Sequence, residues 1–198
     1  IVTPYTTDAN GDEHCVGVND TTEIWVEPTP QVVLVPQSDT ICDGGITNID
    51  ITSVTSPTRP VEFRYIVEPD NPGQVAVTIN GATSGLLNGA IIADNIDNLS
   101  DDKQRVLFIV TPYTTDANGD EHCVGVNDTT EIWVEPTPQV VLVPQSDTIC
   151  DAAATSIEIT SVTNPTRPVE FRYVVEPDNP GQVAVTINGA TSGLLNGA

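Results

Sequence analysis

Hydrophobic and polar residues alternate along short stretches of this chain, and β-branched residues fill many of the apolar positions. Within residues 61–67, Val61, Phe63, Tyr65 and Val67 occupy every second position, with charged residues between the first three. This period of two predicts a strand whose four named side chains face inward. Similar stretches rich in Val, Ile and Thr predict further strands at residues 22–27, 31–35, 46–54, 74–79 and 105–114. No window shows sustained helical periodicity with caps, so we expect an all-β fold.

The whole pattern repeats with a period of 108 residues, because residues 1–90 align without a gap with residues 109–198. A period of this length is the size of an independent domain rather than of a solenoid repeat. About seven strands per period predict tandem immunoglobulin-like β-sandwiches. The positions that differ between the two copies all fall in one stretch: Gly44/Ala152, Gly45/Ala153, Ile46/Ala154, Asn48/Ser156, Asp50/Glu158, Ser56/Asn164 and Ile66/Val174.

The sequence Glu-Pro-Thr-Pro marks the boundaries between repeats, at residues 27–30 and again at 135–138. Alternating prolines favour extended polyproline II geometry, so these stretches are expected to act as semi-rigid linkers. With the boundaries placed there, residues 1–31 form the closing hairpin of one repeat. Residues 32–139 then form a complete immunoglobulin-like repeat, and residues 140–198 form the opening strands of a further one.

The charge of the chain limits its partners. It has 28 acidic and 6 basic residues, which give a formal net charge of −22. Such a surface repels nucleic acid phosphates and anionic membranes. No stretch approaches the roughly 20 apolar residues of a membrane span. We therefore expect neither nucleic acid binding nor membrane insertion. The four cysteines have no metal-ligand spacing and suit an oxidising compartment.

Few residues are candidates for chemistry. His14 and His122 are the only histidines and occupy one position of the repeat, where a solvated turn is expected. No nucleophile and base form a recognisable motif, so we expect no catalysis. Trp25 and Trp133 lie at the end of a predicted strand. We favour packing in the core or at a junction for both tryptophans over a sugar-binding platform.

Two acidic stretches are weak calcium candidates, although no cofactor is the favoured expectation. Asp8, Asn10 and Asp12 have the spacing of the first ligands of a calcium loop, but Glu13 and Asn19 stand where such a loop has Gly and Glu. The Asn-Gly pair within this stretch is also a hairpin signal, and we favour a plain turn.

The second acidic stretch lies in the part of the repeat that is present only once. It contains Asp94 and Asp97, followed by Asp101 and Asp102. We favour a solvated loop here, with weak binding of extracellular calcium as the alternative.

Three motifs recur together in an order that resembles a known family. Thr-Ile-Cys-Asp-Gly-Gly occurs at residues 40–45, Asp-Ala-Asn-Gly at residues 8–11 shortly before Cys15, and Trp-Val-Glu-Pro-Thr-Pro at residues 25–30. This combination resembles the PKD-like, immunoglobulin-like repeats of very large Bacteroidota surface proteins, including those linked to gliding and adhesion. The resemblance implies export to the cell surface, through a type IX system, and a role as a stalk or filament.

Two functions remain open for such a chain. The favoured one is a structural spacer or shaft of an extracellular filament or giant adhesin, because an array that needs only length and stiffness tolerates near-identical repeats. The alternative is an adhesive module that binds glycan or protein through loops of the repeat. The variable stretch at residues 44–56 would then be the recognition surface.

Four Asp-Thr sites resemble the acceptors for O-glycosylation in Bacteroidota, in which an aliphatic residue or Thr follows Asp-Thr. We expect glycans there to shield strand edges and to hinder proteases. The four acceptors are Thr21, Thr40, Thr129 and Thr148.

The cysteines are expected to join repeats. In a sandwich of this topology Cys42 follows the first strand and lies at one end, whereas Cys123 lies at the other end, roughly 30 Å away and beyond the reach of a disulfide. We therefore favour bonds from Cys42 to Cys15 of the next unit and from Cys123 to Cys150 of the preceding one. A bond between Cys42 and Cys123 of the same repeat is the simplest competitor.

The chain itself is the expected partner, either as a subunit or as a neighbouring repeat. Residues 140–198 of one chain and residues 1–31 of the next together make nearly a whole repeat, without a counterpart of residues 91–108. Head-to-tail contacts of this kind propagate as filaments. The alternative, which we favour, is a continuous longer array in which the same bonds join neighbouring repeats.

Overall fold

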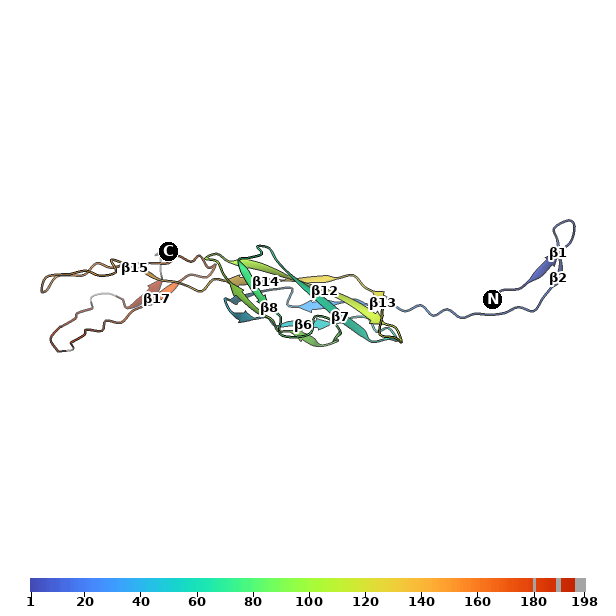
Figure 1. Ribbon diagram of the computed structural model, residues 1–198, viewed down its shortest axis with the longest axis horizontal. Coiled ribbons are helices and arrows are strands. Elements are labelled where there is room, and N and C mark those ends of the chain that lie inside the picture. Colours follow the sequence, from blue (N-terminus) through green and yellow to red (C-terminus); the bar gives the residue numbers. More distant parts are fainter. Residues whose placement is uncertain (180, 188–189, 195–198) are drawn as a thin grey trace.

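Every regular element in the described part of the chain is a β-strand, as predicted. The computed structural model describes residues 1–179, 181–187 and 190–194. A head segment (residues 1–31) carries β1 (Tyr5–Thr7) and β2 (Glu13–Val16). A central β-sandwich follows, from Val33 to Glu135, and a tail segment (residues 140–198) carries the remaining strands. The three parts lie one after another along the long axis (Figure 1).

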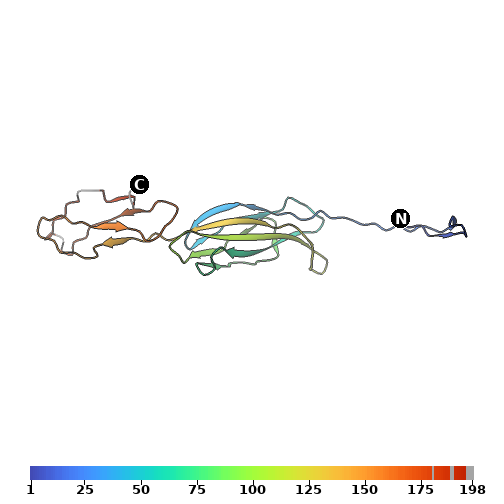
Figure 2. The ribbon, with the colours of Figure 1, turned by 90° about the horizontal axis from the view of Figure 1, so that it is seen from above.

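The central sandwich consists of two layers. One layer is a sheet with the strand order β4-β14-β12-β7-β9, in which β13 also pairs with β12. The other layer contains the small sheets β10-β6-β3 and β5-β11-β8, and most strands run along the long axis (Figure 2). The bounds are β3 (Val33–Val35), β4 (Ser38–Cys42), β5 (Gly45–Ile46), β6 (Ile49–Thr52), β7 (Val61–Pro69), β8 (Val75–Thr78), β9 (Leu86–Leu87), β10 (Ala90–Ile92), β11 (Asn95–Asn98), β12 (Gln104–Thr115), β13 (Glu121–Val124) and β14 (Asp128–Glu135).

The core forms where the two layers face each other. The alternation in β7 is confirmed, because Phe63 and Tyr65 are buried and Val61 and Val67 pack partly buried against the same cluster. Burial of these apolar side chains is the main stabilising term of such a sandwich. The buried cluster consists of Leu34, Ile49, Ile51, Phe63, Tyr65, Val75, Ile92, Ile96, Val106, Phe108, Val110, Ile132 and Val134.

Three expectations about the strands were wrong. Residues 91–108 contain β11 and parts of β10 and β12, so the repeat has more and shorter strands than the expected seven. The short strand β4, which pairs in parallel with β14, was not predicted. Residues 22–27 form no strand, although their counterparts lie in β14, because the residues of β12 and β4 that pair with those counterparts have no equivalents in the head segment.

Identical or nearly identical sequences nevertheless adopt the same local pairing in different parts of the chain. β1 pairs with β2 in the register of the β12–β13 hairpin, with Tyr5 opposite Val16 as Tyr113 is opposite Val124. In the tail segment, β15 (Val141–Val143) pairs with β16 (Glu158–Thr160) in the register of β3 and β6. The tail also contains β17 (Glu170–Arg172) and β18 (Ser192–Leu194), which pair with each other.

Candidate functional site

The contacts between the central sandwich and the tail segment centre on the last residue of β14. Glu135 is buried, and its backbone is part of the sheet beside β4. Its Oε2 accepts a hydrogen bond from the backbone N–H of Thr166 at 2.7 Å. The same contact occurs one repeat earlier, where Oε2 of Glu27 accepts the N–H of Thr58 at 2.6 Å. One side chain of each linker therefore binds the backbone of the part that follows.

A second contact crosses the same junction. The backbone N–H of Asn164 donates to the carbonyl oxygen of Asp101 at 2.7 Å, and its side-chain Nδ2 donates to Oδ1 of Asp102 at 3.2 Å. Asp102 and Asn164 also form an isolated parallel β-bridge. The earlier copy has Ser56 at this position, and serine lacks the amide that reaches Asp102. One of the seven differences between the copies thus lies in a junction contact.

At the opposite, leading end of the sandwich, the first linker is held against the turn that follows β13. Pro30 is buried, and an ideal Cβ on Gly125 would lie 1.9 Å from the Pro30 carbonyl oxygen. Only glycine admits so close an approach of one backbone to another. The N–H of Gln31 also donates to Oγ1 of Thr55 at 3.0 Å. The linker is therefore part of the packed structure at this end.

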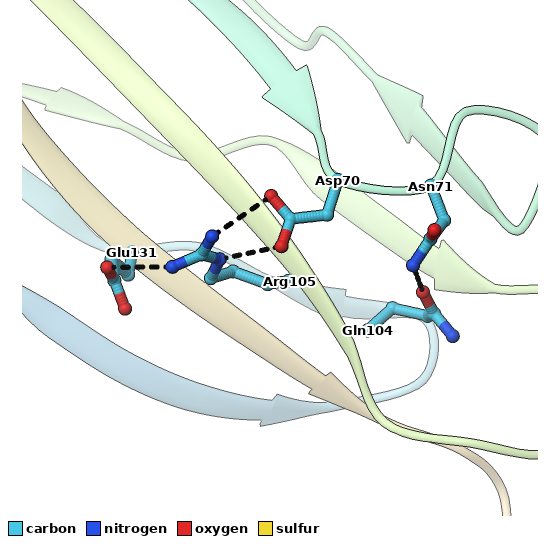
Figure 3. Close-up of polar contacts among 5 residues, drawn as sticks. All are labelled: Asp70, Asn71, Gln104, Arg105 and Glu131. Atoms are coloured by element: carbon cyan, nitrogen blue, oxygen red, sulfur yellow. Dashed lines mark hydrogen bonds and ion pairs between the residues drawn. The ribbon is translucent and has the colours of Figure 1, made fainter.

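Polar side chains fasten three strands together near the trailing end, where Glu135 lies. Arg105 on β12 donates to Asp70 through Nε at 2.8 Å and through Nη2 at 3.3 Å. Its Nη1 donates to Glu131 of β14 at 3.2 Å, and Nδ2 of Asn71 donates to Oε1 of Gln104 at 2.8 Å (Figure 3). These pairs hold the strand ends together and so fix the position of Glu135 at the junction.

Trp133 lies outside the core, so of the two expected roles only packing at a junction stays open. Its neighbours Ile132 and Val134 face the core, so alternation directs the indole to the outer face of the sheet. There Nζ of Lys103 lies 4.3 Å and Cζ of Arg105 lies 5.7 Å from the ring centroid, within cation–π range. Trp25, its counterpart in the head segment, is 87% exposed.

The first calcium candidate forms the expected turn. Oδ1 of Asp8 accepts the backbone N–H groups of Asn10 at 2.8 Å and of Asp12 at 3.0 Å. Both bonds lower the pKa of Asp8 below its ordinary value, and the bond from Asn10 has the larger effect. Gly11 has a φ of 91°, the left-handed conformation that favours glycine. The carboxylate is therefore already engaged in closing its own hairpin.

Only part of the second calcium candidate is a solvated loop, because Asp101 and Asp102 are exposed whereas Asp94 and Asp97 are held in the sandwich. Asp94 is buried, and its Oδ2 accepts the hydroxyl of Tyr65 at 2.7 Å while its Oδ1 accepts the N–H of Asn80 at 2.9 Å. The pKa of Tyr65 is raised well above its ordinary value, chiefly by burial and to a lesser extent by the hydrogen bond to Asp94. Asp97 lies in β11 opposite Ala76. Among the described residues, no group of three or more His, Cys, Asp or Glu is arranged to hold a metal ion.

All four cysteines are free thiols in this structure, and Cys42 and Cys123 lie at opposite ends of the sandwich, as expected. Cys42 is level with Glu135, and Cys123 lies beside Thr114. Each hairpin cysteine has a histidine beside it. Nδ1 of His14 is 3.2 Å from Sγ of Cys15 in the head, and Nδ1 of His122 is 3.1 Å from Sγ of Cys123. The histidines are therefore exposed neighbours of thiols, and they lie in the strands β2 and β13 rather than in the expected turns.

The four candidate glycosylation sites share a local structure. In each, the carboxylate of the preceding aspartate accepts the N–H of the threonine, at 2.7–2.9 Å. Thr21 and Thr148 are exposed, and Thr40 lies on the edge strand β4. Thr129 is half-buried in the inner strand β14. Glycosylation of these residues stays a prediction.

The junction residues were not singled out from the sequence as contacts. Glu27 and Glu135 were read only as part of the linkers, and Gly125 was not noted. The sequence offered only the recurrence of an acidic residue directly before Pro-Thr-Pro, and the near-identity of the two copies already accounts for that recurrence. The partners Thr58 and Thr166 carry no sequence signal, since their backbone N–H groups make the contact.

Comparison with known families gives one match. A family profile described as PKD-like domain matches residues 39–138, which cover the central sandwich from β4 to the end of the second linker. A search of curated proteins found none that matches the chain. In the described part of the chain, there is no helix of the length and hydrophobicity needed to cross a membrane.

Proposed function

The chain belongs to the PKD-like domain family, and we propose that it is a structural spacer in the shaft of an extracellular surface protein. Domains of this family are generally extracellular structural or adhesive modules without catalytic activity. The proposal includes a tandem array of such domains on the surface of a bacterium of the Bacteroidota, as the linker and cysteine motifs suggest. The chain has no role in catalysis in this proposal.

The observation that carries the proposal is the repeated junction contact. A spacer keeps a constant length and a stiff shape only if neighbouring domains keep a fixed orientation. Glu27 and Glu135 bind the backbone of the following part at Thr58 and Thr166, with the same atoms and nearly the same distance. Contacts that recur at both linkers favour one orientation along an array.

The linker supports the same conclusion at its other end. Pro30 is buried against Gly125 of the domain that follows it, whereas Pro138 is exposed beside the tail segment, which has no counterpart of Gly125. A complete following domain would therefore bury Pro138 in the same way. Each linker in an array would then be fastened by its glutamate and by its second proline.

The proposal is tested by hydrogen exchange on the Glu135→Ala variant of the chain. The N–H of Thr166 donates to a carboxylate, and such a bond is worth about 1.5–3 kcal/mol, which predicts roughly 10- to 150-fold faster exchange at Thr166 in the variant. Glu131→Ala is the matched control, because Glu131 lies on the same strand but contacts Arg105. It should leave exchange at Thr166 unchanged.

Two results would count against a spacer. If the backbone N–H of Thr166 in the unaltered chain exchanges as fast as an unprotected amide, the junction does not form in solution. Saturable binding of a glycan or protein ligand to loops of the sandwich would favour the adhesive alternative.

A further inference from the structure

We propose that neighbouring domains are joined by a disulfide between Cys42 of one domain and the cysteine at the position of Cys123 in the next. The proposal rests on the tandem arrangement proposed above. It follows from where the structure puts each cysteine relative to the linker. The two placements come from different linkers of the chain, whose sequences are identical at residues 27–31 and 135–139.

The first placement is that of Cys42 against the linker that leaves its domain. Cys42 is opposite Glu135 in the parallel pair β4–β14. The next residue, Asp43, donates its N–H to the carbonyl oxygen of Glu135 at 2.9 Å and accepts the hydroxyl of Thr137 through Oδ2 at 2.7 Å. The turn that follows Cys42 is therefore bound to the linker as far as Thr137, and Cys42 is exposed beside it.

The second placement is that of Cys123 against the linker that enters its domain. Gly125 touches the carbonyl group of Pro30, and Cys123 lies two residues before it on β13. β13 runs from the hairpin tip toward Gly125, so Cys123 lies farther out from its own domain than Gly125 does. It is consequently displaced toward the preceding domain, alongside the residues that precede Pro30.

The repeat brings these two placements onto one linker. Thr137 corresponds to Thr29, and Thr29 directly precedes Pro30. The turn after Cys42 and the turn after β13 of the next domain thus contact adjacent linker residues, whose Cα atoms are about 3.8 Å apart. Two exposed or half-exposed thiols therefore flank the same short linker from two domains, and the proposed bond requires their Cα atoms to lie about 4.4–6.8 Å apart.

The competing bond within one domain is excluded by distance. Cys42 lies level with Gln104, because both flank the last residues of β14, whereas the N–H of Cys123 donates to Thr114. Gln104 and Thr114 are ten residues apart along β12, which corresponds to about 33 Å at the usual rise per residue. No rearrangement short of unfolding would join these two thiols.

The chemistry also favours the hairpin cysteine as the attacking group. The thiolate is the nucleophile in disulfide formation. Nδ1 of His122, at 3.1 Å from Sγ, can accept the thiol proton when that nitrogen is unprotonated. The thiolate attacks a small disulfide such as oxidised glutathione, forms a mixed disulfide and releases one glutathione thiolate. Cys42 then attacks the mixed disulfide as a thiolate and releases the second glutathione, so two thiols are oxidised and one disulfide is reduced.

The test uses a two-unit chain, defined as the 198-residue chain followed by a second copy of residues 91–139. This addition supplies the strands that the central sandwich has after Ala90. Cys15, Cys123 and Cys150 are changed to Ser, so that only Cys42 and the added copy of Cys123 remain. The protein is incubated with a glutathione redox buffer and analysed by intact mass and non-reducing peptide mapping, with hydrogen exchange at Thr166 measured in parallel.

We expect a monomer that has lost two hydrogen atoms, in which the peptide of Cys42 is linked to that of the added cysteine. The control keeps Cys150 and the added cysteine, with the other cysteines changed to Ser. These two lie at opposite ends of one domain and should stay reduced. A protected Thr166 amide without the link would overturn the disulfide and leave the spacer intact. A link with an unprotected Thr166 amide would support the disulfide and contradict the hydrogen-bonded junction, and the absence of both would overturn both proposals.

Discussion

Replacing Gly125 with Ala should detach the first linker from the sandwich. The new Cβ would lie 1.9 Å from the Pro30 carbonyl oxygen, whereas an ordinary contact between carbon and oxygen is no closer than about 3.3 Å. The linker must therefore retreat by about 1.4 Å, the difference between these distances. Such a retreat exposes Pro30 and strains the bond from Gln31 to Thr55. Overpacking of this kind costs about 1–3 kcal/mol.

Gly17→Ala is the matched control because Gly17 has the same sequence neighbours. An added Cβ would lie 2.8 Å from Cγ of Pro4, just as one on Gly125 would lie 2.8 Å from Cγ of Pro112. Neither glycine has a positive φ, so alanine brings no backbone strain at either position. The contact with Pro30 is the difference between the two sites.

Equilibrium unfolding in urea, followed by tryptophan fluorescence, measures the effect. With a slope of about 2 kcal/mol per molar urea, Gly125→Ala should lower the midpoint by roughly 0.5–1.5 M. Gly17→Ala should lower it by much less, since the head hairpin lies outside the sandwich. Equal midpoints for the two variants would refute the claim that the linker packs on the hairpin turn.

Three further predictions concern the sandwich itself. Gly45→Ala should destabilise the sandwich by about 1–3 kcal/mol, because the new Cβ would lie 2.7 Å from the carbonyl oxygen of Cys42. Gly81→Ala is the control, since its Cβ would meet nothing within 4 Å and should leave stability unchanged. Equal urea midpoints for the two variants would contradict this prediction. Tyr65→Phe should cost about 1–3 kcal/mol in the same assay, since it leaves buried Asp94 without its hydroxyl donor, and a loss below about 0.5 kcal/mol would contradict the role of that bond. Hydrogen bonds from backbone N–H groups of its turn lower the pKa of Asp116 below the ordinary value of 3.8. The ionised carboxylate therefore stabilises the hairpin fully above pH 3.8, and this stabilisation is lost as the pH falls through the lower pKa of the folded state. An NMR titration midpoint at or above pH 3.8 would show that these bonds do not form.

The sequence predicted those parts of the fold that depend on local pattern. The alternation in residues 61–67 located β7 and its buried face, because period-two burial is a property of one strand. The Asn-Gly turns were also predicted, since glycine admits the positive φ at Gly11 and Gly119. Both features need no knowledge of distant residues.

Features that depend on distant partners could not be predicted in this way. β4 reads as a polar segment and becomes a strand only because β14 offers it a free edge. Asp94 looks like a solvent-exposed acid until Tyr65 and Asn80, from two other segments, surround it with donors. For Trp133, core packing and junction packing stayed alternatives in the sequence, because alternation fixes the face of a side chain only once the strand boundaries are known.

The junction belongs to the same class of features. Thr58 and Thr166 contribute only backbone N–H groups, which any residue except proline carries. Ala152, in the copy of the turn after β4, shows how the copies can diverge without changing the local conformation. It keeps a φ of 60° where Gly44 has 71°, although this conformation is costly for alanine.

The central claim is that neighbouring domains hold one fixed orientation, and a distance measurement across the junction tests it most directly. Spin labels are attached to Cys42 and Cys150 of the two-unit chain, in which all other cysteines are changed to Ser, and the distances are measured by double electron–electron resonance. The two sites occupy the same position in successive domains, so the account predicts a single narrow distribution near one domain length, about 40 Å for a strand of twelve residues. Glu135→Ala should broaden it. A broad distribution in the unaltered two-unit chain, insensitive to that substitution, would contradict the account.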